Sequence, residues 1–228
     1  MVAYLAALDN RVEFASINSR RLQPMAKPKV TYFDFAGSRG EEVRLALNLA
    51  GVPFEDNRIS REAFGKIKSE LPFASLPVFE IDGKGVFGQS NAILRLIGRQ
   101  HGLYPEDPFE AARHDALMDA VEDLRLRITP TMRIQDEAEK KAARQQLASD
   151  YIPQWGLCIE RQLGDGPFAF GDRPSVADLK LYMVHKWISG GNIDHIPADL
   201  FARCPKLNRV AEAIENHPAV VAWYANSA

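Results

Sequence analysis

The stretch "LPVFEIDGKGVFGQS" (76–90) combines residue types that could bind a short peptide. Pro77 has no N–H and stands where a strand should begin, a position that tolerates the missing ladder bond. We expect a cis Leu76–Pro77 bond, which leaves the N–H and C=O of Leu76 extended and unpaired, and such an edge can pair with another peptide. Ser90 begins a helix, where free N–H groups and the helix dipole attract a carboxylate.

These features suit a short acidic peptide, held by its backbone and by a carboxylate. The residues alone leave a plainer interpretation equally open, in which Pro77 only begins a strand and Ser90 only caps a helix. The choice between the two depends on the elements that surround the stretch.

Composition and charge narrow the range of partners. Hydrophobic residues make up 46% of the 228-residue chain, enough for one large domain or two small ones. The net charge is −2 and there is no Lys/Arg run, so we expect neither nucleic acid nor a membrane as partner. Cys158 and Cys204 lie far apart, which indicates a reducing, cytoplasmic environment. The five histidines show no ligand spacing, so no metal is expected.

The first half of the chain alternates strand and helix patterns. Ser38 and Glu41 have the spacing of a capping box, and Gly51 stands where a helix would end in the left-handed conformation. Asp82-Gly83 is a hairpin signal. The pattern predicts, in order, a strand at 29–35, a helix at 38–50, a strand at 52–60, a short helix or loop at 61–71, strands at 76–81 and 84–88, and a helix at 90–101 with Ala92, Ile93, Leu96 and Ile97 inward.

The second half shows only helical patterns. Pro130 should interrupt the first of its helices, Asp136 should begin the next, and Ser175 with Asp178 should cap a later one. The first helix has an apparent apolar stripe at Phe109, Ala112, Ala116, Ala120, Leu124 and Ile128. We therefore expect a flexible extension at 1–26, an α/β domain at 27–102, a linker at 103–108 and an all-helical domain at 109–228.

Four motifs, in the same order, are similar to those of a known family. "VTYFDF", "LPFASLPVFEIDG", "FGQSNAILRLI" and "FAFGDRPSVADL" resemble the cytosolic glutathione transferases from about residue 29 to 224. The first-strand tyrosine and "KSELPF" look most like the sigma class, which also contains prostaglandin D synthases and lens crystallins. The resemblance implies a thioredoxin-like domain with a mixed four-stranded sheet, followed by a helical-bundle domain.

The resemblance implies that Tyr32 is the catalytic residue. A free thiol has a pKa of about 8.5, so little of it is thiolate at neutral pH. A hydroxyl that donates to the sulfur stabilises the anion by roughly 1.5–3 kcal/mol, or about one to two pKa units. The alternatives are that Tyr32 is only a packed strand aromatic, or that Ser38 is the donor, as in classes that use a serine.

The resemblance also places the glutathione-binding residues. Gln89 and Ser90 match the pair that holds the γ-glutamyl carboxylate, and Leu76, with Pro77 after it, matches the residue whose backbone pairs with the cysteinyl unit. Lys68 matches a lysine near the glycine carboxylate, and the alternative is a solvated helix lysine.

Two positions depart from the family pattern at the glycine end of glutathione. Phe64 stands where the sigma class usually has a tryptophan, and Ser75 where a lysine is common. Both departures remove hydrogen-bond donors, so binding at this end could be weaker than in the family.

Other residues are assigned to the second substrate and to a dimer. Asp123 matches an aspartate that reaches across a homodimer to the glutathione amino group, though a solvated acidic stripe is the plainer interpretation. Phe33, Arg39 and Arg125 are candidates for the electrophile site. An arginine at position 125 would suit anionic or polar electrophiles, unless it is only a surface residue.

The sequence thus predicts a homodimeric glutathione transferase whose co-substrate is glutathione and whose second substrate is a small electrophile. Two alternatives stay open. One is a glutathione-dependent isomerase, as in the prostaglandin synthases, and the other is a non-catalytic ligand-binding protein with a transferase fold.

Overall fold

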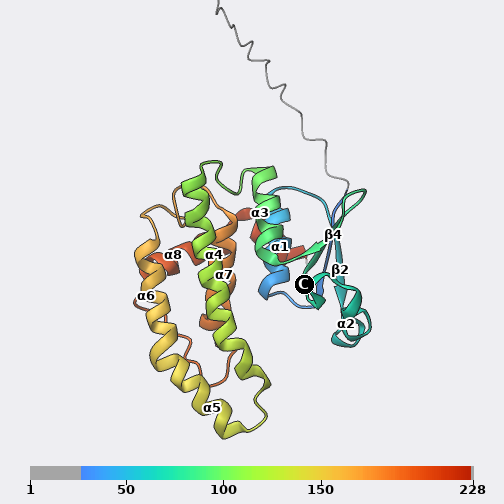
Figure 1. Cartoon of the computed structure of the whole chain (residues 1–228). Helices are drawn as coiled ribbons and strands as arrows, with labels where there is room; N and C mark the ends of the chain where they lie inside the picture. The colour runs from blue at the N-terminus through green and yellow to red at the C-terminus, as the bar shows by residue number, and fades with distance from the viewer. Residues whose placement is uncertain (1–26, 227–228) are drawn as a thin grey trace, which may run out of the picture.

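The computed structural model describes residues 27–226, so the extension expected at 1–26 lies outside the described residues. A small sheet with its helices forms one side of the molecule and a helical bundle forms the other (Figure 1). The predicted fold class, a thioredoxin-like domain followed by an all-helical domain, is confirmed.

The sheet is mixed and has the strand order β2-β1-β3-β4. β1 runs parallel to β2 and antiparallel to β3, with Thr31 opposite Val78, and β3 and β4 form an antiparallel hairpin. Gly83, at φ 71°, makes the predicted turn of that hairpin in the left-handed conformation. The strands span Lys29–Phe33 (β1), Glu55–Ile59 (β2), Val78–Ile81 (β3) and Gly85–Gly88 (β4).

Two of the three helices in this part separate the sheet from the bundle. α1 and α3 lie between the two parts, whereas α2 lies beyond the sheet (Figure 1). Gly51, at φ 65°, follows the end of α1 as predicted. The helices are α1 (Ser38–Leu49), α2 (Arg61–Ile67) and α3 (Ser90–His101), and two 3₁₀ turns follow α2, η1 (Lys68–Glu70) and η2 (Pro72–Ala74).

The capping box predicted for α1 is wrong. Gly37 is the N-cap, and no side chain caps the helix there. Ser38 is instead the first helical residue, at a φ of 60°. The carboxylate of Glu41 is buried and accepts from Arg44 and Trp223, and these side-chain donors take the place of the backbone N–H that a capping box would use.

The bundle begins with the longest helix, α4, which ends two residues before Pro130 as predicted. Asp136 accepts from the backbone N–H of Glu139 at the start of α5, and Ser175 and Asp178 form the predicted capping box of α7. The elements are α4 (Pro108–Ile128), the 3₁₀ turn η3 (Thr129–Arg133), α5 (Glu137–Gln146), the π-helical turn η4 (Leu147–Tyr151), α6 (Ile152–Gln162), α7 (Val176–Ser189), α8 (Pro205–Glu215) and α9 (Pro218–Asn226).

The apolar stripe predicted for α4 is also wrong. Phe109 is 72% exposed, and Ala112 and Ala116 face outward as well. The inward side of α4 contains His114, Leu117, Met118, Val121, Leu124, Arg125 and Ile128. On α3, likewise, Ala92 is exposed and Leu94 is buried. Alanine loses little by exposure, so the larger aliphatic side chains determine which face is buried.

α7 is the central helix of the molecule. All residues from Val176 to Val184 are buried, and α7 packs against α1, α4 and α8. Both cysteines, Cys158 and Cys204, are free thiols. Within residues 27–226, no helix combines the length and the apolar character needed to cross a bilayer, and no three potential metal ligands cluster together.

Candidate functional site

Tyr32 occupies a closely packed position near the carboxyl end of β1. Its side chain is 5% exposed, and its ring centroid lies 5.4 Å from that of Phe33 and 5.7 Å from that of Phe35. At Gly40, in the first turn of α1, a Cβ would come within 2.0 Å of the Tyr32 ring. The absence of a side chain at Gly40 therefore allows the ring to sit against the start of the helix.

The environment keeps the Tyr32 phenol protonated at neutral pH. Burial raises the pKa of Tyr32, while a hydrogen bond with Ser38 and the positive charges of Arg39 and Arg125 act in the opposite direction without cancelling it. A neutral phenol is a hydrogen-bond donor, so Tyr32 can donate to a thiolate but is not itself a base at this pH.

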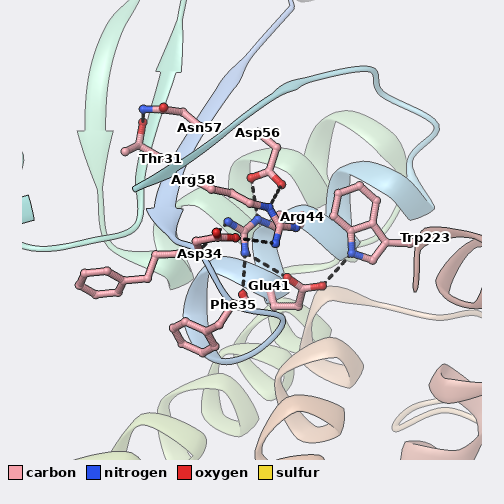
Figure 2. Close-up of polar contacts among 10 residues, drawn as sticks. Thr31, Asp34, Phe35, Glu41, Arg44, Asp56, Asn57, Arg58 and Trp223 are labelled. Carbon is pink, nitrogen blue, oxygen red and sulfur yellow. Dashed lines mark hydrogen bonds and ion pairs between the residues drawn. The ribbon is translucent and has the colours of Figure 1, made fainter. Parts of the chain in front are cut away.

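A buried guanidinium fixes the loop that follows Tyr32. Arg44 on α1 is fully buried, and it donates to the carbonyl oxygens of Phe33 at 3.2 Å and Phe35 at 3.1 Å. These two carbonyls flank Asp34, so the guanidinium holds the turn on both sides (Figure 2). Its charge is balanced by Asp56 on β2, whose Oδ1 lies 2.7 Å from Arg44 Nε.

The same cluster extends to the last helix. Glu41 Oε2 accepts from Arg44 at 3.1 Å, and Glu41 Oε1 accepts from the indole N–H of Trp223 at 2.7 Å (Figure 2). Trp223 belongs to α9, so a residue near the end of the described chain supports the loop beside Tyr32. The sequence patterns did not identify this cluster, although a lone arginine within the apolar run "VRLAL" is a signal that could have done so.

The peptide-binding residues predicted from the sequence come together at one edge of the sheet. The Leu76–Pro77 bond is cis, as expected. Leu76 makes no backbone–backbone hydrogen bond within residues 27–226. Val78 of β3 pairs with Gly88 of β4 in an antiparallel ladder. Leu76–Pro77, just before Val78, therefore lies beside Gln89–Ser90, just after Gly88. Gln89 is exposed at φ 72°, and Ser90 is the first residue of α3.

Phe33, Phe64 and Lys68 form a second group on the α2 side of the loop. The rings of Phe33 and Phe64 meet edge to face at 5.3 Å, and Lys68 Nζ lies 6.0 Å from the Phe64 centroid. Phe33 also lines a small pocket with Ile59 and Arg61. The structure therefore does not bring Phe33 together with Arg39 and Arg125, with which it was grouped from the sequence. Ser75 is half-buried just before the cis bond.

A pocket of about 410 Å³ lies between the two parts of the molecule. Arg39 and Arg125 both line it, and Ser38 and Phe35 connect it to the surroundings of Tyr32. Its walls are otherwise mostly apolar. The full lining is Phe35, Ala36, Gly37, Ser38, Arg39, Arg125, Thr129, Met132, Met183, Lys186, Trp187 and Asn192.

Both arginines of this pocket are paired with carboxylates. Arg125 Nη2 lies 2.5 Å from Glu42 Oε1, and Arg125 Nη1 lies 3.0 Å from Glu122 Oε1. Arg39 Nη2 lies 2.6 Å from Glu122 Oε2. Arg125 is also 2% exposed, which excludes a surface role for it.

Lys180 on α7 completes this interdomain ion cluster. It is fully buried, contacts Glu122 closely, lies 3.4 Å from Glu42 and donates to Asn91 of α3 at 2.6 Å. Burial alone would raise the pKa of Glu122, but Lys180, Arg125 and Arg39 outweigh it and hold that pKa at about 2. Sequence patterns missed Glu42, Glu122 and Lys180 as a group, since their pairing depends on how α1, α4 and α7 pack.

Asp123 remains exposed on α4. One turn earlier, Asp119 accepts from Asn91 at 2.7 Å, and Asp115 accepts from Arg95 at 2.7 Å, so this side of α4 faces α3. The side chain of Asp123 makes no hydrogen bond or ion pair with any of the residues 27–226. Its position leaves the carboxylate accessible to another molecule.

Comparison with known proteins places this geometry in a family. Residues 28–99 match the model of the glutathione S-transferase N-terminal domain, and residues 122–227 match that of the C-terminal domain. The chain belongs to the glutathione S-transferase family. The prediction of an enzyme of this kind is confirmed by several relatives that are glutathione S-transferases.

Individual relatives agree with this assignment. The chain is 44% identical to glutathione S-transferase 1 of Ascaris suum over 110 residues, 48% of this chain and 52% of that protein, so this match spans about half of the relative. It is 30% identical to the hematopoietic prostaglandin D synthase of Gallus gallus, over 87% of this chain and 96% of that protein. The solved structure of the Ascaris lumbricoides glutathione S-transferase has a TM-score of 0.77 at 31% identity, covering 89% of this chain and 98% of that one.

Proposed function

We propose that the protein is a sigma-class glutathione transferase that joins glutathione to small electrophiles and acts in detoxification in the cytoplasm. In the reaction, the thiolate sulfur bonds to an electrophilic carbon, and the leaving group departs with the electron pair of the broken bond. The observation that carries the proposal is Tyr32, a buried phenol kept protonated beside an open peptide edge. Donation from Tyr32 favours the thiolate over the thiol.

In this proposal the edge at Leu76–Pro77 pairs with the cysteinyl unit of glutathione. Gln89 and Ser90, at the start of α3, hold the γ-glutamyl carboxylate through side chain and backbone N–H donors. Lys68 and the neighbouring Phe64 lie at the glycine end, where Phe64 contributes no donor. The interdomain pocket receives the electrophile, with Arg39 and Arg125 contributing positive charge near the sulfur.

We further propose that the active unit is a homodimer, in which Asp123 of a second copy binds the glutathione amino group. Its support is the exposed, unpaired carboxylate of Asp123 on the side of α4 that faces α3, the helix that begins with Ser90. Exposed Phe73, which is 72% accessible in the segment before the cis bond, is an apolar group that a second copy would cover.

A second candidate function is a glutathione-dependent isomerase in which the thiolate is regenerated. The similarity to a prostaglandin D synthase, which covers 87% of this chain and 96% of that protein, supports this candidate. Retention on immobilised glutathione, followed by an assay with a generic aryl halide, separates the candidates. A transferase is retained and releases halide ion from the aryl halide. An isomerase is retained but does not conjugate the aryl halide. A protein that has lost the glutathione site is not retained.

The variant Tyr32→Phe tests the thiolate mechanism directly. It removes the hydroxyl and keeps the ring, so the packing around Gly40 should persist. The pKa of bound glutathione should rise by about one to two units, and turnover near neutral pH should fall roughly ten- to a hundredfold. A thiolate absorbance titration of both proteins measures the first effect.

Tyr151→Phe is the matched control, because Tyr151 lies in the helical domain on η4 and carries the same single-atom change. It should leave the titration curve unchanged. Coincident curves for wild type and Tyr32→Phe would show that Tyr32 is only a packed aromatic. Ser38→Ala would then be the next variant to titrate.

A further inference from the structure

Lys186 is the one lysine in the described lining of the interdomain pocket. It also lines a neighbouring hollow with Glu212 and Glu215, but neither carboxylate forms an ion pair with it. The other two cations of the lining, Arg39 and Arg125, are paired with Glu122 and Glu42. The described residues that line the pocket include no aspartate or glutamate. Within residues 27–226, no carboxylate lies within ion-pair distance of Lys186 Nζ.

The groups that contact the Lys186 ammonium are neutral. Nζ donates to the Tyr182 hydroxyl at 3.2 Å and lies 4.2 Å from the centre of the Tyr224 ring. Burial, with a smaller contribution from Glu215, raises the pKa of Tyr182 to about 12, so this hydroxyl carries no charge at neutral pH. An ammonium has three N–H donors, and the described contacts use one of them for a hydrogen bond.

The position of Lys186 fits a role toward the second substrate. It lies on the α7 wall with Met183 and Trp187, which share its side of the helix and are apolar. The start of α1, which contacts Tyr32, forms a different wall of the same pocket. A molecule between these walls would thus have an apolar body against Met183 and Trp187, with Lys186 at its edge.

We propose that Lys186 binds an anionic group on the electrophile, so that the preferred acceptors join an apolar, ring-sized body to a carboxylate or a similar anion. This proposal rests on the proposed transferase function and specifies its substrate class. It transfers to Lys186 the anion-binding role that the sequence suggested for Arg125, because Arg125 is already paired with Glu42 and Glu122.

Two acceptors that differ only in charge test the proposal. In 4-chloro-3-nitrobenzoate and 4-chloro-3-nitrobenzamide, sulfur bonds to the chlorine-bearing carbon and chloride leaves with the electron pair. Comparing each variant with wild type on the same acceptor cancels the different intrinsic reactivities of the two compounds. Lys186→Met should lower kcat/KM on the benzoate about tenfold more than on the benzamide, mainly through KM. Lys186→Arg keeps the positive charge and should show the wild-type ratio of kcat/KM on the benzoate to kcat/KM on the benzamide.

Lys84→Met is the matched control, since Lys84 lies exposed in the β3–β4 turn and the substitution changes net charge equally. This control variant should leave kcat/KM unchanged on both acceptors. If Lys186→Met lowers kcat/KM by the same factor on both acceptors, or lowers it on neither, the proposal is overturned. Circular dichroism melting of each variant shows whether it is folded. Among folded variants, a lost preference for the benzoate in Lys186→Met together with an unchanged preference in Lys186→Arg supports the proposal.

Binding without reaction distinguishes a failure of this inference from a failure of the transferase proposal. The compounds 3-nitrobenzoate and 3-nitrobenzamide lack the chlorine and cannot be conjugated. Calorimetric titration should give a Kd for the benzoate that weakens about tenfold in Lys186→Met and in high salt, while the benzamide Kd changes much less. That result supports an anion-binding Lys186 even if wild type conjugates neither chlorinated compound, whereas equal binding of both compounds by wild type would refute it.

Discussion

Glu122 should contribute a measurable, pH-dependent share of the stability. Its side chain is 22% exposed, and its carboxylate forms ion pairs with Lys180, Arg125 and Arg39 across the domain interface. Its pKa of about 2 in the fold is about 2.5 below the ordinary 4.5, and each pKa unit corresponds to ~1.36 kcal/mol. Glu122→Gln should therefore lower the free energy of unfolding by about 3 kcal/mol at pH 7.

The sign of the pH dependence follows from the direction of the shift. Because the folded-state pKa lies below the ordinary value, the stabilisation is complete well above pH 4.5 and is lost as the pH falls toward 2. The difference between wild type and Glu122→Gln should thus shrink to about 2 kcal/mol at pH 3.5. Urea unfolding at both pH values, at one fixed protein concentration, measures it.

Glu110→Gln provides the matched control. Glu110 lies on the same helix and pairs with Arg113 at 3.1 Å, but the two side chains are more exposed than that of Glu122, at 39% and 42%. Glu110→Gln should lower the free energy of unfolding by less than about 1 kcal/mol at either pH. If Glu122→Gln costs no more than Glu110→Gln at pH 7, or costs the same at pH 7 and pH 3.5, the interdomain ion cluster does not stabilise the fold in the way described.

Three further variants probe other parts of the site. Gly40→Ala places a Cβ within 2.0 Å of the Tyr32 ring, so turnover with an aryl halide should fall at least tenfold, whereas Gly65→Ala, with nothing within 4 Å, should retain activity. Asp123→Asn should weaken glutathione binding severalfold by calorimetry without changing the melting temperature; tight binding by a verified monomer would contradict the cross-subunit role. Ser175→Ala should lower stability by about 1 kcal/mol in urea unfolding and leave kcat unchanged, because the cap lies in the helical domain and only supports folding.

Local signals predicted much of this fold because they depend on few residues. The Asp82-Gly83 hairpin and the capping box of Ser175 and Asp178 both follow from short-range preferences, and both are present. The same holds for the start of α5 at Asp136, whose side chain accepts from the N–H of Glu139.

Features that depend on packing could not be obtained in this way. The alanines of α4 matched a helical period, but Leu117 and Met118 gain more by burial and set the inward face. The grouping of Arg125 with Glu42 and Lys180 requires three helices that are remote in sequence. The hypothesis that Arg125 serves the electrophile site was formed without those carboxylates, and their presence changes which side chain is available to a substrate.

The bonds between α9 and α1 affect the order in which the molecule can be completed during synthesis. Trp223 donates to Glu41, and Asn48 of α1 donates to the carbonyl oxygen of Ala219 at 2.7 Å. A ribosome produces α1 early and α9 last among the described helices. A nascent chain that still lacks α9 therefore contains Tyr32, Leu76 and Ser90 but not the bonds that complete the Glu41–Arg44 cluster beside them.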